Sequence, residues 1–254
     1  MRSLLWVYGL AGFALFGYLE QWRALGVWLI LMIVARSGLV IRERIEACAF
    51  VRERWFHYFE HLKAEALKLG LVVSMLFIGS ACVQVLTIGL HRAEVAAWYD
   101  QPTSNRLVQW LVSPFVHSDW QHWGSNWVMA VAIVISLPIE RPSKLFGIWL
   151  GSALIVAASP AMSALFPQGS EFVVVGASAG LAGLMGAGWC YSQKRLTSFP
   201  PYFSRIFMVQ FCLAFGLLSS LHSMKSVAAH GLGFGLGFGL AKMRKPKPIN
   251  CQTR

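Results

Sequence analysis

The sequence predicts an all-α protein that crosses a membrane several times, and two observations carry this prediction. First, 56% of its 254 residues are hydrophobic and 13% are charged, with a mean hydropathy of +0.56. A soluble domain of this size cannot cover so much apolar surface. Second, the apolar residues form runs of about 15 to 22 residues, close to the length of a membrane-spanning helix. The runs predict a polytopic membrane protein with a six-helix core and an N-terminal hydrophobic extension.

The N-terminal extension, residues 1–41, contains two apolar runs at 3–19 and 24–40, joined by a short polar link. Each run has about the minimum length for a spanning helix, which predicts a transmembrane hairpin. One tilted span followed by an interfacial helix is the alternative. Residues 4–18 behind Arg2 also resemble a signal peptide, but the second run follows almost at once, which favours a membrane anchor.

Residues 42–66 mix basic and acidic side chains with aromatic ones, the pattern of an amphipathic cytoplasmic or membrane-surface segment. His57 and His61 lie one turn apart here and have the spacing of two metal ligands. A solvated helix face explains them better, so the sequence predicts no metal site.

The core, residues 67–242, contains six further apolar runs, and residues 243–254 form a basic tail. The predicted spans lie near 69–90, 119–137, 145–164, 178–192, 204–221 and 227–242. Most connecting loops alternate in Lys and Arg content, although the 91–118 loop fits less well. The positive-inside rule then puts both termini in the cytoplasm and the 165–177 loop at the outer face.

Charge and cysteine content exclude several function classes. The net charge of +11 comes from short basic segments between apolar spans, which argues against nucleic-acid binding. The five cysteines are scattered without CxxC spacing, so neither a disulfide framework nor a thiolate metal site is indicated. No cofactor is predicted.

Ser178 lies in an uncharged small-residue stretch, residues 172–190. The preceding residues, Val173 to Val175, favour an extended chain, and Gly176 permits a sharp bend. Ser178 is therefore predicted to begin a helix, whose free N–H groups can stabilise an anion. A helix over residues 178–192 is about 22 Å long, shorter than the roughly 30 Å hydrocarbon core, which puts the serine below the membrane surface.

Among the polar residues within predicted spans, three stand out, namely His122, Asn126 and His230. His122 and Asn126 are four apart and share one helix face, behind a predicted capping box of Ser118 and Gln121. Polar residues that only bond helices together are the alternative. Four tryptophans near this pair predict an interfacial aromatic belt: Trp110, Trp120, Trp123 and Trp127.

Glycines accompany both the serine and the last histidine. Gly233 and Gly237 follow His230 on its own helix face, and Gly176 and Gly180 flank Ser178. Small residues at such spacing allow two helices to approach closely. If these two helices pack together, Ser178 and His230 come within hydrogen-bond distance.

In order and spacing, three motifs resemble the rhomboid intramembrane serine proteases: HSDWQHWGSN at residues 117–126, Gly-Ala-Ser at 176–178 and HGLG at 230–233. The resemblance covers roughly residues 67–242. It implies that Ser178 is the nucleophile and His230 its general base. It also implies an oxyanion hole of His122, Asn126 and the Ser178 amide. The implied substrates are transmembrane proteins in the lipid bilayer, and the implied location is a bacterial inner membrane.

Two positions depart from the family pattern. Ala179 replaces the glycine that usually follows the serine, and its methyl group would affect the gap between serine and histidine. Gln109 replaces an arginine that usually lies eight residues before the position of His117. The first departure supports an alternative function, a catalytically weak rhomboid-like protein that binds membrane proteins.

Other enzyme and transporter classes fit less well. The GASAG stretch at 176–180 matches the nucleophile elbow of soluble hydrolases, but that motif needs an α/β sheet and usually an acidic residue between serine and histidine. No Asp or Glu lies between Ser178 and His230. There is no HExxH motif, the two aspartates are not paired in spans, and no repeated halves indicate a transporter.

Overall fold

The structure is a computed structural model of the chain. It describes residues 32, 36–43, 45–88, 106–137, 142–158, 176–193, 200, 202–219 and 224–243. Most of the predicted N-terminal hairpin and nearly all of the basic tail lie outside these residues.

The described part of the chain is helical and contains no strand, as the sequence predicts. Its elements are α3 (Ala49–Ile88), α5 (Arg106–Val112), the short 3₁₀ helix η1 (Ser113–Phe115), α6 (Trp120–Ser136), α7 (Pro142–Ala158), α9 (Ser178–Gln193), α10 (Phe203–Ser219) and α11 (Met224–Met243). The six predicted core runs coincide in position with α3, α6, α7, α9, α10 and α11. Within the described residues, no helix meets the combined length and hydropathy expected of a membrane-crossing segment.

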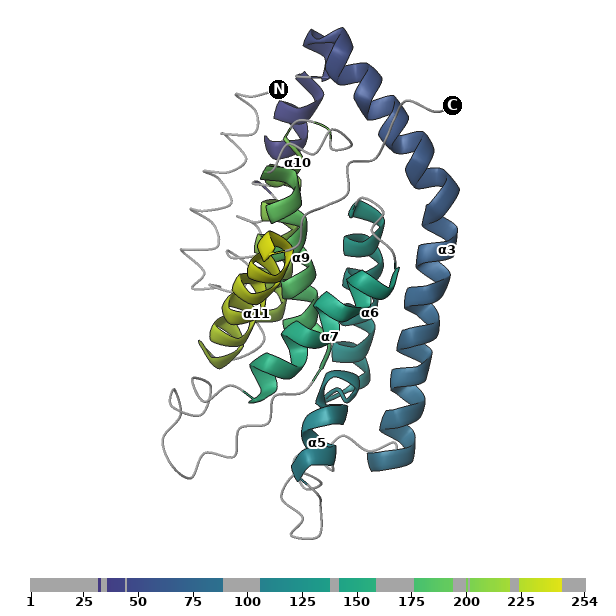
Figure 1. Cartoon of the computed structure of the whole chain (residues 1–254), viewed down its shortest axis with the longest axis vertical. Helices are drawn as coiled ribbons and strands as arrows, with labels where there is room; N and C mark the ends of the chain where they lie inside the picture. The colour runs from purple at the N-terminus through teal and green to yellow at the C-terminus, as the bar shows by residue number, and fades with distance from the viewer. Residues whose placement is uncertain are drawn as a thin grey trace, which may run out of the picture.

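Helix α9 is the centre of the bundle, with α11, α7, α10 and α6 packed around it (Figure 1). All but four of its side chains are buried, and most of these are Gly, Ala, Leu or Met. Small side chains leave little bulk between neighbouring backbones, so several helices can approach α9 at once. This explains why the helix that begins at Ser178 can be buried on nearly all sides.

Helices α9 and α11 touch at glycines. A methyl group at Gly233 would collide with the carbonyl oxygen of Ala179, and one at Gly237 would collide with that of Gly183. The two contacts advance together along both helices, so the helices run parallel in a fixed register. Gly233 and Gly237 are therefore the α11 residues that let the two helices approach closely.

Gly180 contacts α7, whereas its place beside Ser178 predicted a contact with α11, the helix of His230. A methyl group there would lie 2.6 Å from the backbone oxygen of Trp149, on α7. Gly183 faces both Ser152 of α7 and Gly233 of α11. Helix α9 thus uses one glycine stripe for α7 and an overlapping one for α11, because both helices pack closely against it.

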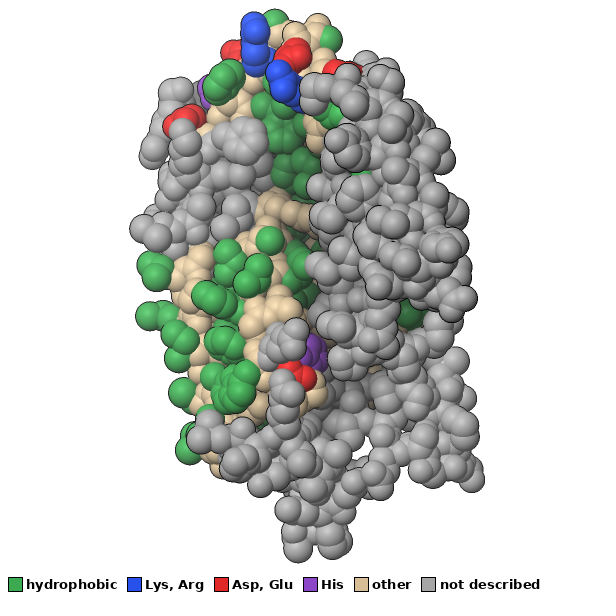
Figure 2. Space-filling model, turned by 180° about the vertical axis from the view of Figure 1, so that it is seen from behind, with side chains coloured by type: hydrophobic (Ala, Val, Ile, Leu, Met, Phe, Trp, Pro, Cys, Tyr) green, Lys and Arg blue, Asp and Glu red, His purple; other side chains and the backbone are tan. Residues whose placement is uncertain are grey.

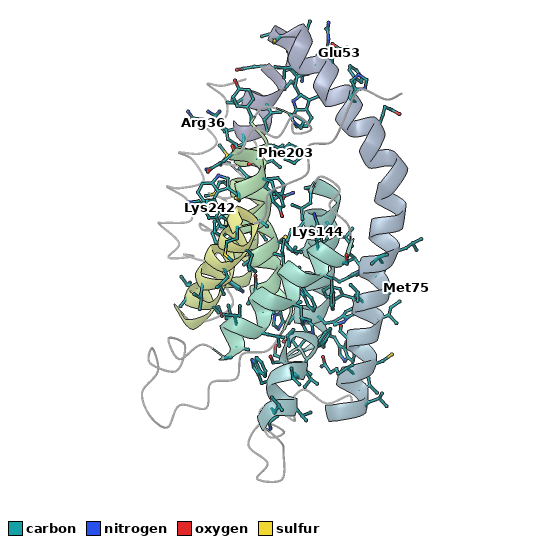
Figure 3. The ribbon with its side chains drawn as sticks, in the orientation of Figure 1. Arg36, Glu53, Met75, Lys144, Phe203 and Lys242 are labelled. Atoms are coloured by element: carbon teal, nitrogen blue, oxygen red, sulfur yellow. The ribbon has the colours of Figure 1, made fainter. Side chains whose placement is uncertain are left out.

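Helix α3 runs along one flank of the bundle as a single helix of 40 residues. It joins the predicted 42–66 segment to the first predicted core span without a break. Figure 2 shows hydrophobic side chains along this flank and charged ones gathered near one end. Figure 3 shows Met75 pointing away from the other helices, where it is 71% exposed, and Glu53 near the charged end.

Tryptophans tie α6 and α5 to their neighbours. The Trp123 indole N–H donates to the Ser80 hydroxyl at 3.0 Å, and that of Trp127 donates to the Ser74 hydroxyl at 3.2 Å, both on α3. The Trp110 indole N–H donates to the Leu154 carbonyl of α7 at 2.9 Å. Three of the four tryptophans predicted as a belt therefore also hold helices together.

Candidate active site

Ser178 begins α9, as predicted, directly after a sharp turn. Gly176 has φ +98°, a conformation that side chains disfavour, which explains glycine at this position. Ala177 follows fully buried, and Ser178 is partly exposed at the helix start. The extended run before Gly176 lies outside the described residues. The turn therefore presents the Ser178 side chain at the positive end of α9.

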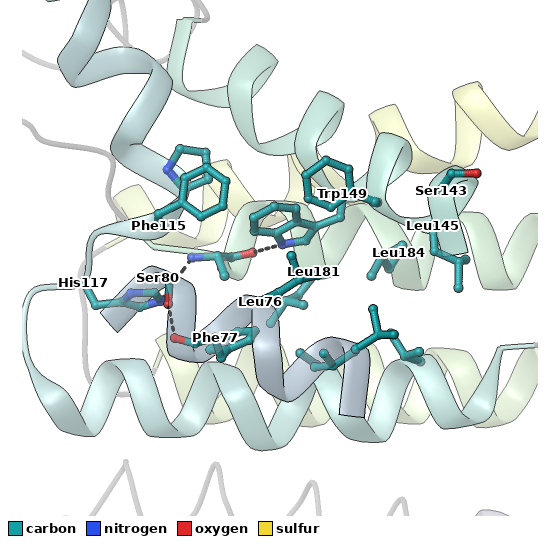
Figure 4. Close-up of a pocket in the computed structure, with 17 residues that line it drawn as sticks. Leu76, Phe77, Ser80, Phe115, His117, Ser143, Leu145, Trp149, Leu181 and Leu184 are labelled. Atoms are coloured by element: carbon teal, nitrogen blue, oxygen red, sulfur yellow. Dashed lines mark hydrogen bonds between the residues drawn. The ribbon is translucent and has the colours of Figure 1, made fainter. Parts of the chain in front are cut away.

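Three hydrogen bonds from different elements hold this turn. The Gly176 N–H donates to the Ser113 carbonyl at 2.9 Å. The Ala177 N–H donates to His117 Nε2 at 3.4 Å, and its carbonyl accepts from Trp149 Nε1 at 3.2 Å (Figure 4). Each bond occupies a backbone group next to the serine, so the turn is fixed by η1, the following loop and α7.

A side chain of α3, Gln84, holds the backbone of His117 in place. Its backbone N–H and carbonyl form two 3.0 Å hydrogen bonds with the side-chain amide of Gln84. His117 is fully buried. Burial lowers the pKa of its imidazole to about 3, and the nearby His122 acts in the same direction. The ring is therefore neutral at physiological pH and able to accept the Ala177 N–H.

Gln84 and Trp149 are supporting residues that the sequence reasoning missed. Gln84 carried a usable signal, because it is a polar side chain within an apolar run. Trp149 carried none, since a tryptophan in an apolar helix is ordinary packing.

Helix α6 begins one residue later than the predicted capping box implies. The cap is Asp119, whose Oδ1 accepts the His122 N–H at 2.8 Å. Ser118 instead bonds to side chains, with its Oγ 3.1 Å from His122 Nδ1. The Ser118–Gln121 box is therefore wrong, because the carboxylate of Asp119 is the group that caps the helix.

His122 and Asn126 lie one turn apart on α6 and face the turn before Ser178. A methyl group placed on Gly176 would be 2.9 Å from His122 Cε1 and 3.4 Å from Asn126 Nδ2. Asn126 is fully buried, and neither polar atom of its side chain has a hydrogen-bond partner in the described structure. A buried amide of this kind is costly unless a ligand satisfies it.

His230 lies on α11, with 5% of its surface exposed. It precedes Gly233 by one turn, and Gly233 contacts the backbone of Ala179. Ala179 and Ala229, the neighbours of Ser178 and His230, share a small apolar cluster with Val156 of α7. The structure thus brings the serine end of α9 and the histidine turn of α11 together. The Ala179 methyl group is absorbed in that cluster.

A cavity of about 350 Å³ lies between α3, η1, α6, α7 and α9 (Figure 4). Its lining is almost entirely apolar and includes His117 and Ala177. The described lining contains none of Ser178, His230, His122 and Asn126.

The described residues hold no group of three or more His, Cys, Asp or Glu side chains placed to bind a metal ion. His57 is exposed on α3, and the side chain of His61 lies outside the described structure.

A family model described as the Rhomboid domain matches residues 104–246. The match covers more than half of the chain and contains every candidate residue. The chain belongs to the rhomboid family. Searches of curated proteins and of solved structures return no match. Rhomboids are integral membrane proteins and generally serine proteases, although rhomboid-like members without protease activity exist.

The rhomboid match begins after α3, so this helix and the predicted segments before it lie outside the matched region. Gln109, one of the two departures from the rhomboid pattern, lies within it on α5 and is buried with 2% of its surface exposed. A neutral amide thus occupies a buried position where the rhomboid pattern usually has an arginine.

Proposed function

We propose that this rhomboid is an intramembrane serine endopeptidase that cleaves transmembrane proteins with a dyad of Ser178 and His230. The observation that carries the proposal is the parallel, glycine-mediated contact of α9 and α11. It brings the start of α9 beside the His230 turn. His122 and Asn126 approach the same turn from a different helix, α6.

In this mechanism His230 removes the proton from Ser178 Oγ as the oxygen attacks the substrate carbonyl. The oxyanion that forms is stabilised by the Ser178 N–H, the Asn126 amide and the His122 ring. His230 then gives its proton to the leaving amine, and water hydrolyses the acyl-enzyme. The scheme is a dyad without a carboxylate, in keeping with the lack of Asp and Glu between the two residues in the sequence.

The substrate class follows from the membrane setting. The scissile peptide bond lies in or near the outer end of a transmembrane segment, close to where α9 begins below the surface. A helical peptide bond is inaccessible to attack, so residues that weaken the substrate helix promote cleavage. The protein is multi-pass in a bacterial inner membrane with both termini cytoplasmic. It needs neither cofactor nor nucleic acid.

The alternative function is a non-proteolytic rhomboid that binds membrane proteins, which the Ala179 departure supports. The packing of Ala179 argues for the protease. Its methyl group lies with Val156 and Ala229, while the tight contact with Gly233 uses the Ala179 backbone. A glycine at position 179 would make the same backbone contact.

Cleavage of a single-span reporter in liposomes tests the proposal. We expect Ser178→Ala and His230→Ala each to lower the rate at least about a thousandfold. Ser192→Ala is the matched control, because Ser192 lies near the other end of α9 and its hydroxyl donates to Trp189 of the same helix. Retained cleavage in either dyad variant, or no cleavage by the wild type on several reporters, would contradict the protease function.

A further inference from the structure

Three side chains at the start of α6 form a connected polar group. Ser118 Oγ lies 3.1 Å from Asp119 Oδ2 and 3.1 Å from His122 Nδ1. The other carboxylate oxygen, Asp119 Oδ1, caps the helix at the His122 N–H. Asp119 therefore has two functions, since one oxygen orders the backbone of His122 and the other contacts the hydroxyl beside its ring.

The ring is also held on its second side. His117 packs edge-on against His122, with ring centroids 5.2 Å apart, and Gly176 lies beside Cε1 and Nε2. With Nδ1 on the Ser118 hydroxyl, the Nε2 edge faces the turn that carries Ser178. Rotation of the ring by half a turn would break the Ser118 contact and exchange the positions of Nε2 and Cε1 at that turn.

The Ser118 hydroxyl has one proton for two neighbours. If it donates to Asp119, Nδ1 must carry the ring proton and donate to Ser118. If it donates to Nδ1 instead, a neutral ring carries its proton on Nε2, and the hydroxyl no longer donates to Asp119 Oδ2. In both arrangements the hydroxyl fixes the ring plane, and it couples the proton position on His122 to Asp119.

We propose that Ser118, anchored by Asp119, is a positioning residue that orients the His122 ring and sets which of its nitrogens carries the proton. The orientation rests on the contacts above. Its consequence for catalysis rests on the proposed function, in which His122 stabilises the oxyanion.

Kinetics with a matched pair of serine variants tests the catalytic consequence. Ser118→Ala is expected to lower kcat roughly tenfold to a hundredfold with little change in KM, because a misplaced oxyanion donor affects the transition state. Ser118→Thr keeps the hydroxyl and is expected to restore most of the rate. Ser125→Ala is the control, since the Ser125 hydroxyl donates to the His122 backbone carbonyl, at 2.9 Å, and not to the ring.

Nitrogen NMR of labelled histidine tests the orientation without relying on cleavage. The spectra are recorded in a Ser178→Ala background, with His122 assigned by its loss in His122→Asn. We expect Ser118→Ala to change the His122 ring nitrogen signals and their proton distribution, and Ser125→Ala to leave them unchanged. Asp119→Asn keeps an oxygen that can cap the helix but no longer offers two acceptors, so it is expected to shift the proton distribution as well.

Unchanged His122 signals in Ser118→Ala would overturn the proposal. So would a wild-type kcat in that variant together with a normal thermal midpoint. If the NMR result holds but Ser178→Ala retains cleavage on a reporter, the positioning is correct and the proposed protease function is wrong.

Discussion

At the scale of single residues, the side chains around Ser178 divide into those that face the serine turn and those that hold it. His122 and Asn126 face it from α6, whereas Trp149, His117 and Ser113 bond to its backbone. The sequence pointed to the first set through polar residues in apolar runs. It did not show the second set, because hydrogen bonds to a backbone leave no spacing pattern in the chain.

Trp149→Phe tests the support of the turn. Phenylalanine keeps most of the packing but loses the indole N–H that donates to Ala177. We expect a loss of about 1 kcal/mol in the free energy of unfolding, the usual net value of such a bond. The reporter rate is expected to fall about tenfold, since small shifts of a nucleophile are costly. A wild-type rate and stability would show that the bond does not support the turn.

Ala179→Gly tests the departure from the rhomboid pattern. Because the methyl group lies in the cluster with Val156 and Ala229, its removal leaves a small void and introduces glycine into a helix. We expect a loss of about 1 to 2 kcal/mol in stability and a cleavage rate close to that of the wild type. A large gain in rate would mean instead that the methyl group restricts the site.

The neutral state of His117 predicts a pH dependence of stability. Its pKa is lowered to about 3 in the folded protein, against about 6.5 when unfolded. Below pH 6.5 the unfolded chain therefore binds a proton that the folded protein does not. The contribution to stability is fully present above pH 6.5 and decreases as pH falls toward 3, by about 2 kcal/mol at pH 5.

Thermal midpoints measured in detergent between pH 7.5 and pH 5 check this dependence. His117→Gln removes the titrating group while keeping an oxygen that can accept the Ala177 N–H. We expect the midpoint of the variant to change less over this range than that of the wild type. Parallel curves for the two proteins would assign the pH dependence to other groups.

At the scale of helices, the glycines of α11 separate into two faces. Gly233 and Gly237 lie against the α9 backbone, whereas a methyl group added to Gly231, Gly235 or Gly239 would meet no atom of the described residues within 4 Å. The sequence shows an unbroken alternation of glycine with larger residues. Only the register of the two helices decides which glycines are needed for contact.

Gly237→Ala and Gly235→Ala form a matched pair for this interface. The first places a methyl group on the Gly183 carbonyl, and we expect it to cost about 1 to 3 kcal/mol of stability. The second adds a methyl group that meets none of the described residues, so it is expected to be neutral or stabilising by up to about 1 kcal/mol through helix propensity. Equal effects of the two changes in a denaturation series would contradict the parallel register.

At the scale of the whole molecule, one helix organises the bundle. Helix α9 contacts α6, α7, α10 and α11, so residues far apart in the chain reach the Ser178 turn from several directions. The long helix α3 contributes at a distance, because Gln84 holds His117, which in turn accepts from Ala177.

The predicted membrane orientation is testable in intact cells. The positive-inside rule puts the 165–177 loop outside and the basic tail inside. In a background without other cysteines, Ser170→Cys is expected to react with a membrane-impermeant thiol reagent, and Cys251 only after permeabilisation. The reverse pattern would invert the orientation and put Ser178 near the cytoplasmic face.

The sequence by itself determined the helical class, the positions of the core helices, the start of α9 at Ser178 and the pairing of α9 with α11 through glycine. These follow from local properties, namely apolar runs, backbone freedom at Gly176 and small side chains at helical spacing. The tertiary structure decided the rest: Asp119 as the α6 cap, Gly180 against α7, the place of the Ala179 methyl group, and the bonds from Trp149 and His117 to the serine turn. Those features depend on contacts between segments that are far apart in the chain. Such contacts form only when the helices have packed together.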